Sequence, residues 1–349
     1  MNSNGFIVYA TPQKQLEKLK SRDLIVQDDA AALSALALYG YSNVIKSYRD
    51  PYVYVSENGD KYYRSGVTFD QVASLYLLDK NLRNSVMAAM LAIEECIKEA
   101  AADVVADSFG VSSNNYLSFR NFQNRRKKPD RFSLSSILKK MNNELHSEKD
   151  PVHYYMTKYG DVPPWILFKN VYFSTIVNYI DQFKATERNM FIKHIYDPVF
   201  LSKSGDVSSL MRHTLFMCLA YRNTAAHGGR IYNLDYQQNN FPLGQNNLHG
   251  FNKLLTLLSV LKYKQPFYQL QNSLNVELTR HCSSFPEDVT YLGVTLNMNI
   301  ETSQRVYISQ KSRIYHTDPR CSGIKNATET DLSTAISDGY AACKKCVHV

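Results

Sequence analysis

The strongest chemical signal in the sequence is an arginine and a histidine near the end of one helical segment. The helical pattern covers residues 207–227 and stops at Gly228-Gly229, a usual helix terminator. Arg222 falls within a stripe of apolar residues, where a guanidinium requires a carboxylate, a phosphate or a water-filled cleft. His227 lies in the last turn, and imidazole exchanges protons near neutral pH. Together the pair could hold a phosphate and move protons around it.

The spacing of this pair limits how one chain can use it. Five residues correspond to about 140° of rotation on an ideal helix, so Arg222 and His227 cannot easily face the same atom. Either the helix end is distorted, or two copies of the chain share one cleft, and the small residues 224–226 would allow two helices to approach closely. The structural alternative is an arginine paired with a buried glutamate and a histidine that caps its helix.

A second candidate site is a basic segment that contains a single acid, Asp130, and is interleaved with Phe119, Phe122 and Phe132. Its cations are Arg120, Arg125, Arg126, Lys127, Lys128 and Arg131. Cations that neutralise phosphates release counterions, and phenylalanines can stack on unpaired bases. We therefore interpret the segment as a candidate RNA contact, with a solvated loop as the alternative.

A third candidate site is a cysteine-histidine cluster near the C-terminus, formed by His316, Cys321, Cys343 and Cys346, with His348 as a spare ligand. A Cys-x-x-Cys pair joined to a second pair is typical of structural zinc. The segment has too few residues for a robust core, and zinc can contribute about 10–16 kcal/mol of apparent folding energy. Four ligands leave no open position, so we expect a structural zinc. The alternative is a redox pair or reduced surface thiols at Cys343 and Cys346.

Helical periodicity dominates the elements that position these residues. A long helix is expected to begin at Thr68, and an Asn58-Gly59 pair predicts a hairpin turn. Trp165 and the tyrosines near it are assigned to the core, on one helix that follows Pro163-Pro164. Helices are predicted over residues 13–48 (two, with Asp28 or Asp29 as an N-cap between them), 68–105, 133–146, 164–180, 207–227 and 253–271, and strands over 289–300 and 305–315.

Composition narrows the class of protein. The chain has 349 residues, 44% of them hydrophobic and 21% charged, which is typical of a folded protein. A net charge of +8 weakly favours polyanionic partners. No apolar stretch reaches the roughly 18 residues of a membrane span, and the N-terminus lacks the features of a secretory signal. We therefore expect a soluble, cytoplasmic protein with no membrane partner.

The helix that carries the arginine-histidine pair also carries a family resemblance. YRNTAAHGGRIYN (residues 221–233) resembles the R-N-x-x-A-H-x-x-R-x-x-N signature of Abi-like proteins, which are abortive-infection phage-defence proteins of the HEPN ribonuclease superfamily. The resemblance covers most of residues 13–235. Four further segments agree in order: QLEKLKSRDLIVQDD, LYGYSNVIKSY, TFDQVASLYLLDKNLR and PVHYYMTKYGDVPPWILF. The C-terminal tail resembles small Ada-like metal-binding modules.

The resemblance implies an all-α HEPN-type helical bundle, which we place over residues 1–282. A change in sequence character near residue 283 indicates a linker over 283–303, and the cysteine-histidine cluster predicts a small zinc-stabilised α+β module over 304–349. It also implies a homodimer that cleaves RNA without a metal, by attack of a 2′-hydroxyl on the adjacent phosphate. Arg222 would hold the phosphate, His227 would move protons, Asn223 would orient them, and Arg230 would contact RNA. The usual second histidine of the signature is Gly228 here.

Two other functions remain open at this point. The protein could bind a structured non-coding RNA without cutting it, as part of a phage-defence or toxin-antitoxin system, and Gly228 favours this reading. A weaker possibility is a partner for nucleotide transfer, although Tyr232 does not have the spacing expected for that role.

Overall fold

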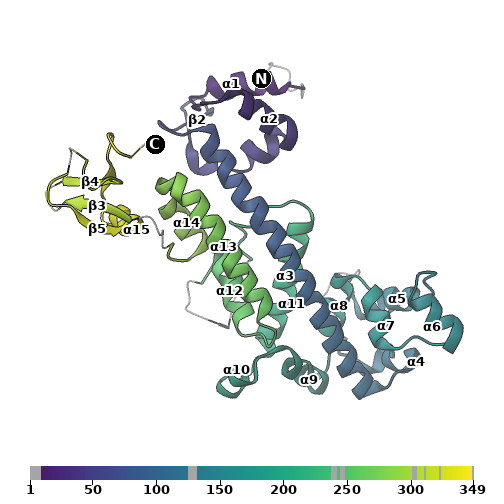
Figure 1. Ribbon diagram of the computed structural model, residues 1–349. Coiled ribbons are helices and arrows are strands. Elements are labelled where there is room, and N and C mark those ends of the chain that lie inside the picture. The colour runs from purple at the N-terminus through teal and green to yellow at the C-terminus, as the bar shows by residue number, and fades with distance from the viewer. Residues whose placement is uncertain are drawn as a thin grey trace. The chain divides into compact units, whose positions relative to one another are not determined.

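The computed structural model describes residues 9–124, 132–236, 242–243, 248–300, 305–309, 312–321 and 324–347. The described chain is predominantly helical and carries a small group of strands near its C-terminus (Figure 1). It divides into two compact units, one formed by Met1–Leu82 with Ser273–Val349 and the other by Arg83–Asn272. The longest helix, α3 (Phe69–Phe109), runs from the first unit into the second.

The N-terminal part of the first unit folds as its sequence predicts. The Asp28 side chain accepts hydrogen bonds from the backbone N–H groups of Ala30 and Ala31 at the start of a helix, and the Thr68 side chain accepts one from Gln71 at the start of α3. The Asn58-Gly59 turn joins two antiparallel strands. The elements before α3 are α1 (Pro12–Lys20), α2 (Asp29–Tyr39), the short helices η1 (Ser42–Lys46) and η2 (Asp50–Tyr52), and strands β1 (Val53–Val55) and β2 (Lys61–Tyr63).

One predicted strand in the first unit is wrong. Residues 289–300 were expected to be extended because they are rich in β-branched residues, but they contain helix α14 (Val289–Leu296). Val289, Leu292 and Leu296 are buried at helical spacing, so packing outweighs the weak intrinsic preference for strand. The expected linker, residues 283–303, thus holds the end of α13 (Gln265–Ser284), the short helix η5 (Pro286–Asp288) and α14.

The C-terminal segment forms a small α+β module with a four-stranded sheet in the order β5-β3-β4-β6. The strands predicted within residues 305–315 are present, as β3 (Arg305–Ser309) and β4 (Ser312–His316). The other elements are β5 (Thr328–Asp331), α15 (Leu332–Ser337) and β6 (Ala341–Ala342). Among the described residues, the buried hydrophobic cluster consists of Val306, Tyr315, Leu332 and Ala335, which is small for an independently stable fold.

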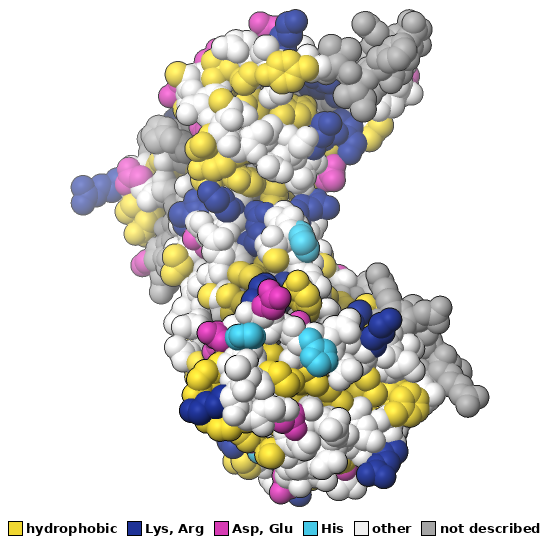
Figure 2. Space-filling model, turned by 90° about the vertical axis from the view of Figure 1, so that its right-hand side faces the viewer, with side chains coloured by type: hydrophobic (Ala, Val, Ile, Leu, Met, Phe, Trp, Pro, Cys, Tyr) yellow, Lys and Arg dark blue, Asp and Glu magenta, His cyan; other side chains and the backbone are white. Residues whose placement is uncertain are grey.

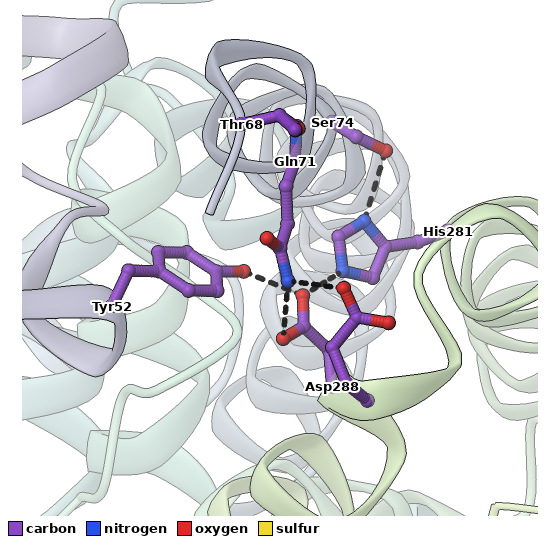
Figure 3. A network of polar contacts seen from close by, with 7 residues as sticks. Tyr52, Thr68, Gln71, Ser74, His281 and Asp288 are labelled. Carbon is purple, nitrogen blue, oxygen red and sulfur yellow. Dashed lines mark hydrogen bonds and ion pairs between the residues drawn. The ribbon is translucent and has the colours of Figure 1, made fainter. Parts of the chain in front are cut away.

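A buried polar network ties the segment before α14 to α3 (Figure 3). The ring of His281 is fully buried, with Nδ1 2.9 Å from Ser74 Oγ and Nε2 2.8 Å from Asp288 Oδ2. The same carboxylate accepts hydrogen bonds from the Tyr52 hydroxyl at 2.6 Å and from Gln71 Nε2 at 3.0 Å. Asp288 therefore joins η5 to η2, α3 and α13 within the first unit.

Replacement of Asp288 by Ala should destabilise the first unit strongly. The change leaves His281, Tyr52 and Gln71 buried without their shared acceptor, and breaking a buried pair typically costs about 3–5 kcal/mol. Denaturant unfolding followed by circular dichroism measures the loss. Glu57→Ala, which removes an exposed acid from the same unit, is the matched control and should change stability little. Equal effects of the two substitutions would show that the network adds nothing.

The second unit is helical, and α11 (Ser208–Ala226) packs against α8 and α9. The helix predicted to follow Pro163-Pro164 is two helices, α7 and α8, and the helix predicted over 253–271 is likewise divided between α12 and α13. The elements after α3 are α4 (Ser113–Tyr116), η3 (Phe119–Asn121), α5 (Leu134–Glu144), α6 (Val152–Tyr159), α7 (Pro164–Asn170), α8 (Phe173–Ile180), α9 (Ala185–Ile195), α10 (Pro198–Lys203), α11 and α12 (Gly250–Ser259).

The assignment of Trp165 and its neighbouring tyrosines to the core is wrong in part. Trp165 is 38% exposed and Tyr172 is 79% exposed, whereas Phe168 and Ile176 are buried. The break between α7 and α8 turns Tyr172 outward, which a single continuous helix would not do. None of the helices in the described ranges combines the length and the apolar character that crossing a membrane requires.

Candidate functional site

The signature residues lie at the C-terminal end of α11. The apolar stripe predicted for this helix is buried, including Met211, Leu215 and Cys218, which fixes the rotation of the helix in the unit. His227 is the C-cap residue, and its backbone N–H donates to the carbonyl of Asn223 at 3.0 Å. The helix ends there because the next residue, a glycine, takes a left-handed φ of +71°.

Arg222 faces a buried carboxylate, as its place in the apolar stripe requires. Its Nε lies 3.6 Å from Oε2 of Glu94 on α3, and the Glu94 side chain is 11% exposed. Neither of these two atoms has a hydrogen-bond partner among the described residues. The guanidinium also donates from Nη1 to Oδ1 of Asn223, at 3.5 Å. The carboxylate therefore neutralises Arg222 without the short, two-point geometry that strong arginine pairs use.

Glu94 also serves a second cation. Its Oε1 lies 2.8 Å from Nζ of Lys98, one turn further along α3, and Lys98 is only 13% exposed. One carboxylate thus lies between two positive groups, Arg222 and Lys98. Neither Glu94 nor Lys98 was predicted from the sequence, although their spacing of four residues and the need of Arg222 for an anion are signals of such a group.

His227 differs from Arg222 in its surroundings. Its side chain is exposed, and no hydrogen bond or ion pair of its ring to another described residue is present. Arg83 on α3 donates from Nη1 to the carbonyl of Gly228 at 2.6 Å, which brings a further guanidinium to the end of α11. No hydrogen bond or ion pair joins Arg222 to His227 within the described chain.

The structure therefore contains both features of the structural alternative, an arginine paired with a buried glutamate and a histidine at the helix cap. It also leaves the imidazole of His227 open to solvent, and the ion pair of Arg222 among the described residues, with Glu94, is a loose one. One chain does not bring the two groups to a common point, as the rotation between them predicts. A cleft shared by two chains remains a prediction.

The basic segment is described only in part. Arg120 is exposed, whereas Arg125, Arg126, Lys127, Lys128 and Arg131 lie outside the described residues. Phe122 is buried, with its ring centroid 4.8 Å from that of Tyr179, so it belongs to the core and is not available to stack on a base. Arg230, the other predicted RNA contact, is partly buried after the end of α11.

The lower part of the face in Figure 2, which belongs to the second unit, shows separate Lys and Arg side chains instead of one continuous basic surface. Histidine side chains are exposed there beside acidic and hydrophobic ones. Strong non-specific binding of nucleic acid usually depends on clustered cations. The lower part of this face shows no such cluster among the described residues.

The four predicted metal ligands come together in the C-terminal module. The candidate ligand atoms of His316, Cys321, Cys343 and Cys346 all lie within 4.8 Å of one another. Cys321 Sγ and Cys343 Sγ are 3.8 Å apart, and Cys346 Sγ is 3.4 Å from His316 Nδ1. A disulfide would place its sulfurs about 2.05 Å apart, whereas two thiolates on a tetrahedral zinc at about 2.3 Å lie about 3.8 Å apart.

The protonation chemistry of the cluster also suits a metal. Burial holds the pKa of His316 below its ordinary value, which favours the neutral ring that a metal binds. Burial alone would raise the pKa of the Cys343 thiol, but hydrogen bonds from the backbone of Lys345 and Cys346 and from neighbouring thiols leave it below its ordinary value. A neutral imidazole and thiolates are the donor set of structural zinc sites.

Comparison with known proteins gives one match. A family model described as Abi-like protein matches residues 34–233, more than half of the chain. The matched range includes Arg222, Asn223 and His227 and ends before the C-terminal module. Neither a curated protein nor a solved structure gives a significant match.

Proposed function

The chain belongs to the family of Abi-like proteins, and from that membership we propose that it is an endoribonuclease of phage defence that cleaves RNA without a catalytic metal. The observation that carries the proposal is the end of α11, where a loosely paired guanidinium, Arg222, and an exposed imidazole, His227, belong to one signature. The superfamily resemblance of that signature supports a homodimer with a composite site.

The proposed reaction uses the RNA itself as the nucleophile. His227 removes the proton of a 2′-hydroxyl, the 2′-oxygen attacks the adjacent phosphorus, and the bond to the 5′-oxygen of the next nucleotide breaks. A proton delivered to that oxygen leaves a 5′-hydroxyl on one fragment and a 2′,3′-cyclic phosphate on the other. Arg222 stabilises the negative charge that grows on the phosphate oxygens in the transition state, and Asn223, which already contacts Arg222, orients the groups.

A dimer would supply what one chain lacks. Because Arg222 and His227 point about 140° apart on an ideal helix, a phosphate held by Arg222 of one subunit can meet His227 only from a second copy. Thr224, Ala225 and Ala226 lie between them and are small enough for two helix ends to approach. An isologous interface of this kind would create two equivalent sites.

The cysteine-histidine cluster is proposed to hold zinc for structure. His316, Cys321, Cys343 and Cys346 complete a tetrahedral shell and leave no position for substrate. The module lies outside the matched family range, so we assign it to stabilisation or recognition and not to the cleavage step.

The experiment that tests the proposal is cleavage of an RNA pool by the zinc-loaded protein in magnesium-free buffer with EDTA. The expected products carry 2′,3′-cyclic phosphate and 5′-hydroxyl ends, which end-specific ligation and mass spectrometry identify. Cleavage that disappears in chelator and returns with magnesium would contradict a metal-independent mechanism.

Glu94→Gln should tighten the binding of RNA. The charged carboxylate of Glu94 competes with a phosphate for Arg222 and Lys98, whereas the neutral amide of the glutamine does not. The Kd for RNA should therefore fall about fivefold, a change of the size found for single charge pairs. Fluorescence anisotropy with an uncleavable 2′-O-methyl RNA measures it. The control is Asp107→Asn, which removes an exposed charge from the same helix. Weaker binding by the Glu94 variant would contradict a role for Arg222 as phosphate ligand.

The alternative is a protein that binds a structured RNA without cutting it. The ion pair of Arg222 with Glu94 and the glycine at position 228 favour this alternative. It predicts RNA affinity that falls steeply with salt concentration and no cleavage of any RNA pool. A cleaved pool with cyclic phosphate ends would exclude it.

A further inference from the structure

We propose that a cavity between α3 and α7 in the second unit is a nucleobase subsite, in which Trp165 stacks on a base of the RNA strand whose phosphate Arg222 binds. This inference rests on the proposed function and names where the substrate lies beside the same site. The cavity has a volume of about 760 Å³, within the range of sites that hold small organic ligands.

The walls of the cavity combine an aromatic side chain, two cations and three carboxylates. Trp165 contributes an indole that is 38% exposed. Lys98 and Lys169 also line the cavity, together with the acids Glu94, Glu95 and Glu99. Nζ of Lys98 donates to the backbone carbonyl of Lys169, so the cations lie at the Lys98–Lys169 side of the cavity, and the carboxylates offer acceptors to the amino groups of a base. An aromatic plane next to cations is the combination with which proteins bind unpaired bases and the adjoining backbone.

Glu94 links this cavity to the proposed phosphate site. It lines the cavity, and its Oε2 lies 3.6 Å from Nε of Arg222 on α11. The residue is 9% exposed, yet Oε2 has no hydrogen-bond partner among the described residues. A buried acceptor of this kind normally has a donor, and the amino group of a nucleobase would supply one, to this oxygen or equally to the amide oxygen of the Glu94→Gln variant. A single carboxylate, that of Glu94, thus lies between the cavity and Arg222. One nucleotide can therefore place its base in the cavity and its phosphate at Arg222.

The exposure of Trp165 needs an explanation that packing does not give. Phe168, on the same helix and lining the same cavity, is 1% exposed, so α7 does bury its aromatic residues where they serve the core. Stacking on aromatic side chains typically strengthens binding by about 1–3 kcal/mol per base and tolerates different sequences. Trp165 is thereby assigned to substrate binding, as a positioning residue outside the catalytic pair.

The test uses the fact that Trp165 is the only tryptophan of the chain, so intrinsic indole fluorescence reports on this position alone. The probe is an end-labelled 2′-O-methyl RNA, which cannot be cleaved, compared with an abasic oligonucleotide of the same length. The base-containing probe should quench the fluorescence saturably, and the abasic one should not. Trp165→Ala should weaken binding of the base-containing probe about tenfold by anisotropy, whereas Trp165→Phe should keep most of the affinity.

The matched control is Tyr172→Ala, which removes an aromatic residue that is 79% exposed and does not line the cavity. It should leave both quenching and affinity unchanged, and circular dichroism checks that every variant is folded. The subsite is overturned if the base-containing probe leaves the fluorescence of the parent unchanged and Trp165→Ala binds this probe as tightly as the parent. It is also overturned if the parent does not bind the probe. If the probe quenches the fluorescence but ordinary RNA is not cleaved, the subsite is supported and the nuclease is refuted. If ordinary RNA is cleaved but the probe does not quench the fluorescence, the nuclease is supported and the subsite is refuted.

Discussion

Replacement of His227 by Ala is expected to lower the rate of RNA cleavage by a factor of about 10²–10⁴, the usual contribution of a general acid or base. The ring is exposed and makes no hydrogen bond to another described residue, so its removal should not disturb the fold. Initial rates of cleavage of a labelled RNA, measured in EDTA, give the effect. Unfolding curves should superimpose on those of the parent.

His153→Ala is the matched control for this prediction. His153 is an exposed histidine on α6 in the same unit and has no place in the signature. The control should cleave RNA at the parental rate. A loss of activity that is equal in both variants, or absent from the His227 variant, would contradict the assignment of His227 as the proton-transfer group.

Loss of metal from the C-terminal module is expected to have the largest effect on stability. Structural zinc contributes about 10–16 kcal/mol of apparent folding energy in small domains, and the buried hydrophobic cluster of the module's described residues is small. Cys343→Ser should therefore abolish metal binding and the protection of β3 and β4 in hydrogen exchange, while the helices of the second unit stay protected.

The measurement combines the metal content of each variant with hydrogen exchange. One zinc per chain is expected for the parent and for Cys96→Ser, a matched control that changes a half-buried cysteine far from the cluster in the sequence. If Cys343→Ser kept a protected sheet without metal, the module would fold on its own core and the cluster would serve another purpose.

Local patterns in the sequence were sufficient for the starts of α2 and α3 and for the cluster of candidate metal ligands. Asp28 and Thr68 cap helices as expected, because an N-cap acts on residues only two or three positions away. The four ligands of the C-terminal cluster were found because their spacing is a property of a short segment. The zinc itself remains a proposal that the geometry supports.

Features that depend on tertiary packing were harder to predict. The strand expected over residues 289–300 is helix α14, because burial of one helical face outweighs strand preference. Tyr172 was assigned to the core because aromatic periodicity cannot show that α7 and α8 are separate helices. Glu94 could not be identified as the partner of Arg222, because the sequence shows that a guanidinium needs an anion but not which helix brings one.

The most direct test of the shared site is to mix two inactive variants, Arg222→Ala and His227→Ala. If each site takes Arg222 from one subunit and His227 from the other, a mixed dimer contains one complete site. Free exchange of subunits should then restore about a quarter of the parental cleavage rate, since half of the dimers are mixed and each has one of two sites. A mixture that stays inactive, although native mass spectrometry shows mixed dimers, would contradict a catalytic site shared between two chains.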